Sequence, residues 1–160
     1  MIILFIRHAE AKNDKLTKFG KIQGKMLSKQ KEDYKFAKIY TSPLKRCQET
    51  AKFYNKQFKL PIEVDERIKE RETLEREPVS KQEKEWYDNY MNPKYSSAQP
   101  EGCRNFLERV YEFLGERIFE HYQKNENIVI VAHSGIFYAV LSYLNKNKTG
   151  DINWYKVGNA

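Results

Sequence analysis

NIVIVAHSG, at residues 127–135, is the clearest structural signal in this sequence of 160 residues. The run Asn127 to Ala132 is short and apolar, which is typical of a strand that is buried on both faces. His133, Ser134 and Gly135 follow it directly, and the apolar residues from 136 to 144 recur at helical spacing. A buried strand that passes straight into a helix is a building unit of α/β domains.

Three further strands are predicted on the N-terminal side of this unit, at Met1 to Ile6, Phe36 to Thr41 and Pro61 to Val64. Amphipathic segments separate them. Because strands alternate with helices, we expect an α/β fold: a three-layer α/β/α domain with a mostly parallel central sheet.

The predicted helices have recognisable starts and apolar stripes. Thr17 is placed to cap the first helix, and Ser42 and Pro43 are placed as the N-cap and first-turn residues of the second. The stripe of the first is Phe19, Ile22, Met26 and Leu27; that of the second is Leu44, Cys47, Ala51, Tyr54 and Phe58; that of a long third helix is Phe106, Val110, Phe113, Ile118 and Tyr122. His121, late in the third helix, is expected at the surface or as support for the helix C-terminal dipole.

Residues 66–100 interrupt the alternation, being highly charged at first and then rich in Tyr, Asn, Pro and Ser. We expect one domain over residues 1–160, with 66–100 as a cap or lid insertion near the site. Trp86, Tyr87, Tyr90 and Tyr95 would either pack this cap or form an aromatic wall for a substrate.

Charge and composition exclude several classes of function. Lys and Arg number 29 against 22 Asp and Glu, a net charge of +7, but the lysines are interleaved with glutamates as on solvated helix faces, so no nucleic-acid partner is expected. The apolar runs are far below the roughly 20 residues of a membrane span. We expect a cytoplasmic protein with no membrane partner and with Cys47 and Cys103 as reduced thiols. The oligomeric state is left open.

Cationic side chains and histidines follow three of the predicted strands. Arg7 and His8 follow the first strand, Arg46 lies on the first turn after the second, and His133 follows the fourth. The carboxyl ends of parallel strands share one edge of the sheet, so these side chains are expected to face one crevice. Guanidinium groups and free backbone N–H groups match phosphate oxygens, so the cluster predicts a site for a dianion.

Five segments match, in order, the motifs of one known family. They are RHAE at 7–10; Leu16, Thr17, Gly20, Gln23 and Gly24; YTSPLKRCQETA at 40–51; RIKER at 67–71; and IVIVAHSG at 128–135. The chain resembles the histidine phosphatase superfamily, also called phosphoglycerate-mutase-like. It departs from the pattern at Ala9, where the family usually has Gly. Pro100, Glu101 and Gly102 resemble the family's Gly-Glu-Ser element, with Gly102 where a Ser is usual, so Glu101 is expected only behind the residues that touch the phosphate.

The resemblance implies phosphoryl transfer through a phosphohistidine on His8, without metal or cofactor. Arg7, Arg46 and His133 would bind the phosphate oxygens, and His133 would also be catalytic. Glu70 matches the proton donor, with Glu72 as the alternative. Asn13 lies one residue from where some members place a phosphate-binding Asn.

The expected function is a phosphatase acting on a small phosphomonoester metabolite. The alternatives are a protein phosphohistidine phosphatase, phosphoglycerate-mutase-type phosphotransfer and, in another class, a binding module that kept the phosphate pocket without turnover. Ala9 occurs in the phosphohistidine branch, but that branch generally lacks the acid glutamate, so Glu70 favours phosphomonoesters. The substrate itself is left open.

Overall fold

The computed structural model describes residues 1–29, 34–71, 101 and 103–144. Its centre is a sheet of four parallel strands in the order β1-β6-β4-β5. The strands are β1 (Ile3–Arg7), β4 (Phe36–Thr41), β5 (Ile62–Val64) and β6 (Asn127–Ala132). The predicted parallel sheet is therefore confirmed, and each strand lies within two residues of its predicted bounds.

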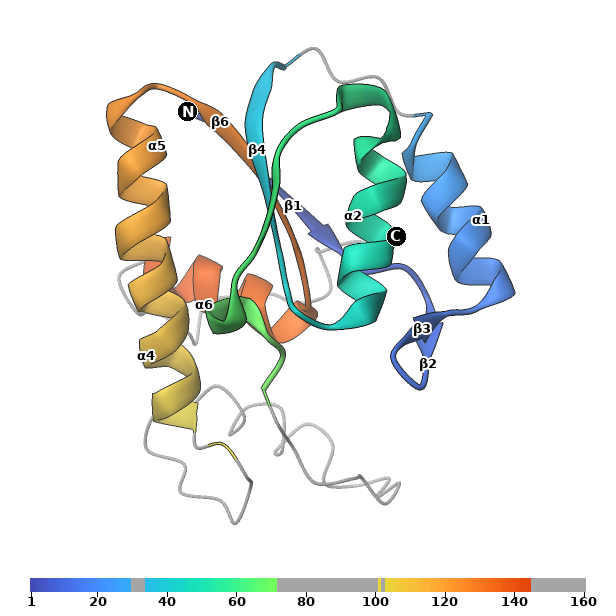
Figure 1. Ribbon diagram of the computed structural model, residues 1–160. Helices are drawn as coiled ribbons and strands as arrows, with labels where there is room; N and C mark the ends of the chain where they lie inside the picture. The colour runs from blue at the N-terminus through green and yellow to red at the C-terminus, as the bar shows by residue number, and fades with distance from the viewer. Residues whose placement is uncertain (30–33, 72–100, 102, 145–160) are drawn as a thin grey trace.

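Strand β6 lies between β1 and β4 and is buried on both faces from Ile128 onward. Val129 and Val131 pack on one side with Cys47, Ala51 and Tyr54 of helix α2 (Lys45–Phe58). Ile128, Ile130 and Ala132 pack on the other side with residues of α4 (Cys103–Phe113) and α6 (Ser134–Leu144). Successive side chains of β6 thus point alternately into two hydrophobic cores, one on each face of the sheet. Helices cover both faces (Figure 1). The predicted three-layer α/β/α architecture is confirmed.

Helix α1 (Lys18–Leu27) begins where predicted, since the Thr17 hydroxyl accepts a hydrogen bond from the Gly20 amide over 3.0 Å. Its predicted apolar side is nevertheless largely outward, with Phe19, Ile22 and Met26 all more than half exposed. The inward side is made by Gly20 and Gly24. A Cβ at Gly20 would overlap the Glu10 carbonyl, and one at Gly24 would lie 2.6 Å from the Phe53 ring. Glycines therefore let the helix approach more closely than its larger side chains would allow.

The predicted role of Ser42 as N-cap is wrong. Helix α2 begins at Lys45, with Leu44 at the N-cap position and no hydrogen bond from a capping side chain of its own. Asp14 supplies the acceptor instead, because its carboxylate accepts hydrogen bonds from the amides of Lys45 (3.0 Å) and Arg46 (3.4 Å). Asp14 lies in the turn of a hairpin formed by β2 (Ala11–Lys12) and β3 (Lys15–Leu16).

The predicted long helix is present as α4, a π-helical turn η2 (Leu114–Ile118) and α5 (Phe119–Gln123). The expectation that His121 lies at the surface is wrong, since its side chain is buried. The His121 ring lies 2.8 Å from the Tyr40 hydroxyl and 2.7 Å from a carboxylate oxygen of Glu126. A buried imidazole needs such partners, and here they come from β4 and from the turn before β6.

Residues 72–100, which form most of the predicted cap with its four aromatic side chains, lie outside the described residues. Of residues 66–71, the first three form the short helix η1 (Glu66–Ile68), which packs against α4. Within the part of the chain that the structure describes, every helix is too short or too polar to cross a membrane.

Candidate active site

The register of the sheet brings the two predicted histidines to one edge. Arg7 pairs with Ala132, so His8 and His133 each follow directly on neighbouring strands. The ladder continues one step further, because the His8 amide donates to the Ala132 carbonyl and the Ser42 amide donates to Val131. The two imidazole rings meet edge to face with centroids 5.2 Å apart. Parallel pairing is thus sufficient to place them side by side.

The hydrogen bonds of His8 define its tautomer. Nδ1 lies 2.8 Å from the Ala9 carbonyl oxygen, which only accepts, so Nδ1 carries the proton. Nε2 accepts a hydrogen bond from Nε of Arg46 over 3.1 Å, and a guanidinium only donates. Nε2 therefore keeps its lone pair and is the nitrogen available for nucleophilic attack.

Arg46 is the centre of the cluster. Besides the bond to His8, its NH2 lies 3.3 Å from Nδ1 of His133, and its NH1 forms an ion pair of 2.9 Å with Asp14. The Arg46 carbonyl accepts from the Thr50 hydroxyl, whose oxygen accepts in turn from the Ala9 amide. This guanidinium is thus fixed between both histidines.

His133 is buried behind this guanidinium. Its Nδ1 accepts from Arg46, so its Nε2 donates to the Ser42 hydroxyl, 2.8 Å away. The Cys47 sulfur lies 3.4 Å from the same Nε2. Ser42, predicted as a helix cap, therefore orients the second histidine instead.

Burial and positive charge keep both rings neutral. Burial lowers the pKa of His8, and the charges of Arg46 and Arg7 lower it further, although the bond to Ala9 acts in the opposite direction. Burial, followed by Arg46, lowers the pKa of His133 to about 2. Burial raises the pKa of the Cys47 thiol to about 12, so this free cysteine is not a nucleophile.

Glu70 approaches the site from the segment after η1. One carboxylate oxygen accepts a hydrogen bond from the Gly135 amide over 3.4 Å, two residues beyond His133. Burial raises the pKa of the Glu70 carboxyl, against the hydrogen bonds from the Arg71 and Gly135 amides. A carboxyl that holds its proton at higher pH than an exposed glutamate is suited to act as a general acid.

The remaining predicted residues are placed differently. Arg7 ends β1 and is exposed, and its charge acts on both histidines. Asn13 lies in the turn of the β2–β3 hairpin with an exposed side chain and a positive φ of 49°. Its neighbour Asp14 is the residue that contacts Arg46. Glu72, the alternative acid, lies outside the described residues.

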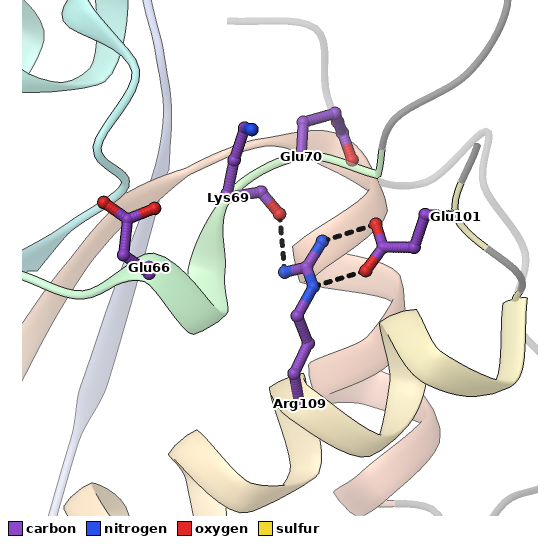
Figure 2. Close-up of a pocket in the computed structure, with 5 residues that line it drawn as sticks. All are labelled: Glu66, Lys69, Glu70, Glu101 and Arg109. Carbon is purple, nitrogen blue, oxygen red and sulfur yellow. Dashed lines mark hydrogen bonds and ion pairs between the residues drawn. The ribbon is translucent and has the colours of Figure 1, made fainter.

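Of three further residues at the site, Asp14 and Arg109 were missed, and Glu101 was expected only behind the residues that touch the phosphate. The available signal for Asp14 was that Asn13 lies one residue from the position where some family members have a phosphate-binding Asn. The other two line a pocket of about 280 Å³ beside Glu70, together with Glu66 and Lys69 (Figure 2). Figure 2 shows the Arg109 guanidinium reaching from α4 to the Glu101 carboxylate.

Among the described residues, no three His, Cys, Asp or Glu side chains are grouped so that they could hold a metal ion. The side chains whose charge lowers the pKa of His8 are the guanidinium groups of Arg46 and Arg7. They suit an anion with several oxygens.

Several known proteins resemble this chain in sequence or in structure. The model of the histidine phosphatase superfamily (branch 1) matches residues 3–160. A protein of Hydrogenobacter thermophilus with the provisional name phosphoserine phosphatase 2 is 29% identical, over 89% of this chain and 77% of the relative. The α-ribazole phosphatase of Shigella flexneri has a similar structure, with a TM-score of 0.74 and 24% identity over 94% of this chain and 82% of that one. A mycobacterial glucosyl-3-phosphoglycerate phosphatase, in complex with inorganic phosphate, has a TM-score of 0.74 at 17% identity, over 94% and 83% of the two chains.

Proposed function

This chain belongs to the histidine phosphatase superfamily (branch 1), and on that premise we propose that it hydrolyses a small phosphomonoester through a covalent phosphohistidine on His8. One observation carries the proposal. The Arg46 guanidinium donates to Nε2 of His8 while the Ala9 carbonyl accepts from Nδ1, so the ring presents an unprotonated nitrogen beside a fixed positive charge. Nucleophile and charge stabilisation are then combined in one place.

In the first step, the Nε2 lone pair of His8 gives up its hydrogen bond from Arg46 and attacks phosphorus, and the ester P–O bond breaks in line with the new N–P bond. The leaving oxygen takes the proton of the Glu70 carboxyl. In the second step, Glu70, now a carboxylate, removes a proton from water, which attacks the phosphohistidine. The N–P bond breaks, its electron pair returns to Nε2, and inorganic phosphate is released.

Arg46, Arg7 and His133 would bind the phosphoryl oxygens during both steps. The charge on these oxygens is spread over three positions in the transition state, and donors fixed beforehand stabilise it without reorganisation. His133 is neutral in the free site and its single N–H donates to Ser42, so the two arginines contribute the charge, and His133 donates to a phosphoryl oxygen only if it gives up Ser42.

A small phosphorylated metabolite is the proposed substrate because Glu70 supplies a proton donor. An alkoxide leaving group needs protonation, whereas a protonated imidazole leaves without such help. The raised pKa of Glu70 therefore favours phosphomonoesters over protein phosphohistidine. The names of two similar structures support the same proposal, since α-ribazole phosphatase and glucosyl-3-phosphoglycerate phosphatase are both named after small phosphorylated molecules.

Hydrolysis of p-nitrophenyl phosphate by wild type and His8→Ala, with EDTA present, tests this proposal. We expect turnover that His8→Ala abolishes, and radiolabelled phosphate on the wild-type chain that is stable to alkali and lost in acid. Turnover that is indifferent to His8 would exclude the mechanism. Hydrolysis of a phosphohistidine peptide in the absence of any phosphomonoester turnover would favour the protein-substrate alternative, and exchange between phosphoglycerates faster than phosphate release would favour a mutase.

A further inference from the structure

Arg109, on α4, binds the main chain that leads to Glu70. Its NH1 donates to the carbonyl oxygen of Arg67 over 2.6 Å and to that of Lys69 over 2.8 Å. Its guanidinium carbon also lies 4.9 Å from the centre of the Phe106 ring, which is fully buried in the core. Arg109 thus connects the core side of α4 to the residue immediately before Glu70.

Glu101 holds this guanidinium from the opposite side. Its two carboxylate oxygens accept from Nε (2.6 Å) and NH2 (2.8 Å) of Arg109 in a bidentate pair, drawn in Figure 2. Both side chains are about four-fifths covered, with 21% and 18% exposed, so water competes little with the pair. The Glu101 carbonyl oxygen also accepts from Nε of Arg71 over 2.9 Å. The two residues that flank Glu70 are therefore both bound to the Glu101–Arg109 pair.

Glu70 depends on such contacts because no regular secondary structure holds it. Helix η1 ends at Ile68, Lys69 is its C-cap, and residues 69–71 are neither helix nor strand. The hydrogen bond from the Gly135 amide, on the opposite side of the site, to the Glu70 carboxylate is long at 3.4 Å. A shift of this segment would move the carboxyl away from His133 and its neighbours.

We propose that Arg109, oriented by Glu101, is a positioning residue that keeps the Glu70 carboxyl against the leaving oxygen of the substrate. The inference rests on the proposed role of Glu70 as proton donor. Arg109 itself does not touch the phosphoryl group in this arrangement, because it is occupied by Glu101 and by two carbonyl oxygens. Its loss therefore affects proton delivery and leaves the nucleophile, His8, in place.

Leaving-group dependence separates this role from a general structural one. Proton donation matters for an alkyl phosphate such as glycerol phosphate, and hardly at all for p-nitrophenyl phosphate, whose phenolate leaves unaided. A positioned general acid contributes about 10²- to 10⁴-fold, so we expect Arg109→Lys to lower kcat/KM, which reports only the step that breaks the ester bond, about 10²-fold on the alkyl ester and less than about 3-fold on the aryl ester. Arg117→Lys is the matched control, since Arg117 is similarly covered but pairs with Glu63 away from the site.

A double-mutant cycle completes the test. In the Glu70→Gln background, Arg109→Lys should cause no further loss on the alkyl ester, because the group that it positions is already absent. Glu101→Gln keeps the shape of the side chain and should shift the alkyl-to-aryl ratio in the same direction. Equal losses of kcat/KM on both esters, or an undiminished loss in the Glu70→Gln background, would overturn the positioning role. If Glu70→Gln alone leaves the ratio unchanged, the proposed acid role fails first.

Discussion

Arg46 donates a hydrogen bond from Nε to Nε2 of His8 over 3.1 Å, and the same guanidinium reaches Nδ1 of His133 over 3.3 Å. The site is therefore organised around one planar cation with a fixed orientation. A planar guanidinium can satisfy several acceptors at defined angles, which an ammonium group cannot do. The lone pair that attacks phosphorus is thus kept unprotonated by the residue that also stabilises the developing charge.

Arg46→Lys should therefore impair catalysis although it preserves the charge. Lysine cannot contact both rings and Asp14 at once, and losing one preorganised donor costs about 10²- to 10³-fold in kcat. Steady-state hydrolysis of p-nitrophenyl phosphate measures the loss. Arg104→Lys is the control, because the Arg104 side chain is 77% exposed on α4. A kcat within a factor of two of wild type would show that the planar guanidinium of Arg46 is dispensable and that a positive charge is sufficient.

Asp14 is an internal anion at the phosphate site. It pairs with Arg46 and accepts from the first amides of α2, positions that a phosphate would also use. Burial alone would raise its pKa, but the hydrogen bonds from these amides and from Arg46 lower it, so the carboxylate is charged at neutral pH. We expect a bound dianion to be repelled by it.

Asp14→Asn removes this charge and keeps one oxygen acceptor. At a separation of several ångströms near the surface, one charge is worth about 1 kcal/mol, so the inhibition constant for inorganic phosphate should fall about 3- to 10-fold. Competitive inhibition of p-nitrophenyl phosphate hydrolysis measures this change. Glu63→Gln, which removes an acid paired with Lys38 and Arg117, should leave the constant unchanged. Weaker phosphate binding in Asp14→Asn would contradict the repulsion.

The sequence indicated the sheet and the meeting of the histidines because both follow from local patterns. Apolar runs mark β1, β4 and β6, and parallel strands necessarily bring their carboxyl ends to one edge. His8, Arg46 and His133 each lie within five residues of such an end. Their convergence therefore needed no knowledge of distant contacts.

The wrong predictions concern side chains whose partners in the structure are distant in the sequence. Ser42 has the sequence context of a helix cap, but His133 takes its hydroxyl and Asp14 caps the helix instead. His121 has the context of a surface residue, but Tyr40, 81 positions away, provides a buried partner. The apolar side chains of α1 face outward because glycines on the opposite side pack more closely.

The pH dependence of kcat/KM, which reports the free enzyme and the first chemical step, should separate the nucleophile from the acid. Burial, then Arg46 and Arg7, lower the pKa of His8 below its ordinary 6.5, so loss of the neutral ring produces an acidic limb below that value. Burial raises the pKa of Glu70 above its ordinary 4.5, and activity on an alkyl phosphate falls as pH rises through that raised value. In Glu70→Gln the alkaline limb should vanish while the acidic limb persists. An alkaline limb that survives unchanged would assign it to another group.

Acid stability should report the buried neutral state of His133. Burial lowers its folded pKa from 6.5 to about 2, so below pH 6.5 the unfolded chain binds a proton that the folded protein does not. The stability contributed by this group is therefore complete above pH 6.5 and decreases as pH falls toward 2. Between pH 7.5 and 5.5, protonation of residue 133 in the unfolded chain should therefore lower the free energy of unfolding by about 1.4 kcal/mol.

Urea unfolding of wild type and His133→Asn at the two pH values measures this contribution. The variant should start less stable at pH 7.5, because Ser42 and Arg46 lose a partner. Its further decrease between pH 7.5 and 5.5 should nevertheless be smaller than that of wild type by about 1.4 kcal/mol, because the titrating ring is gone. Parallel decreases in the two proteins would mean that His133 titrates alike in the folded and unfolded states, and the lowered pKa would then be excluded.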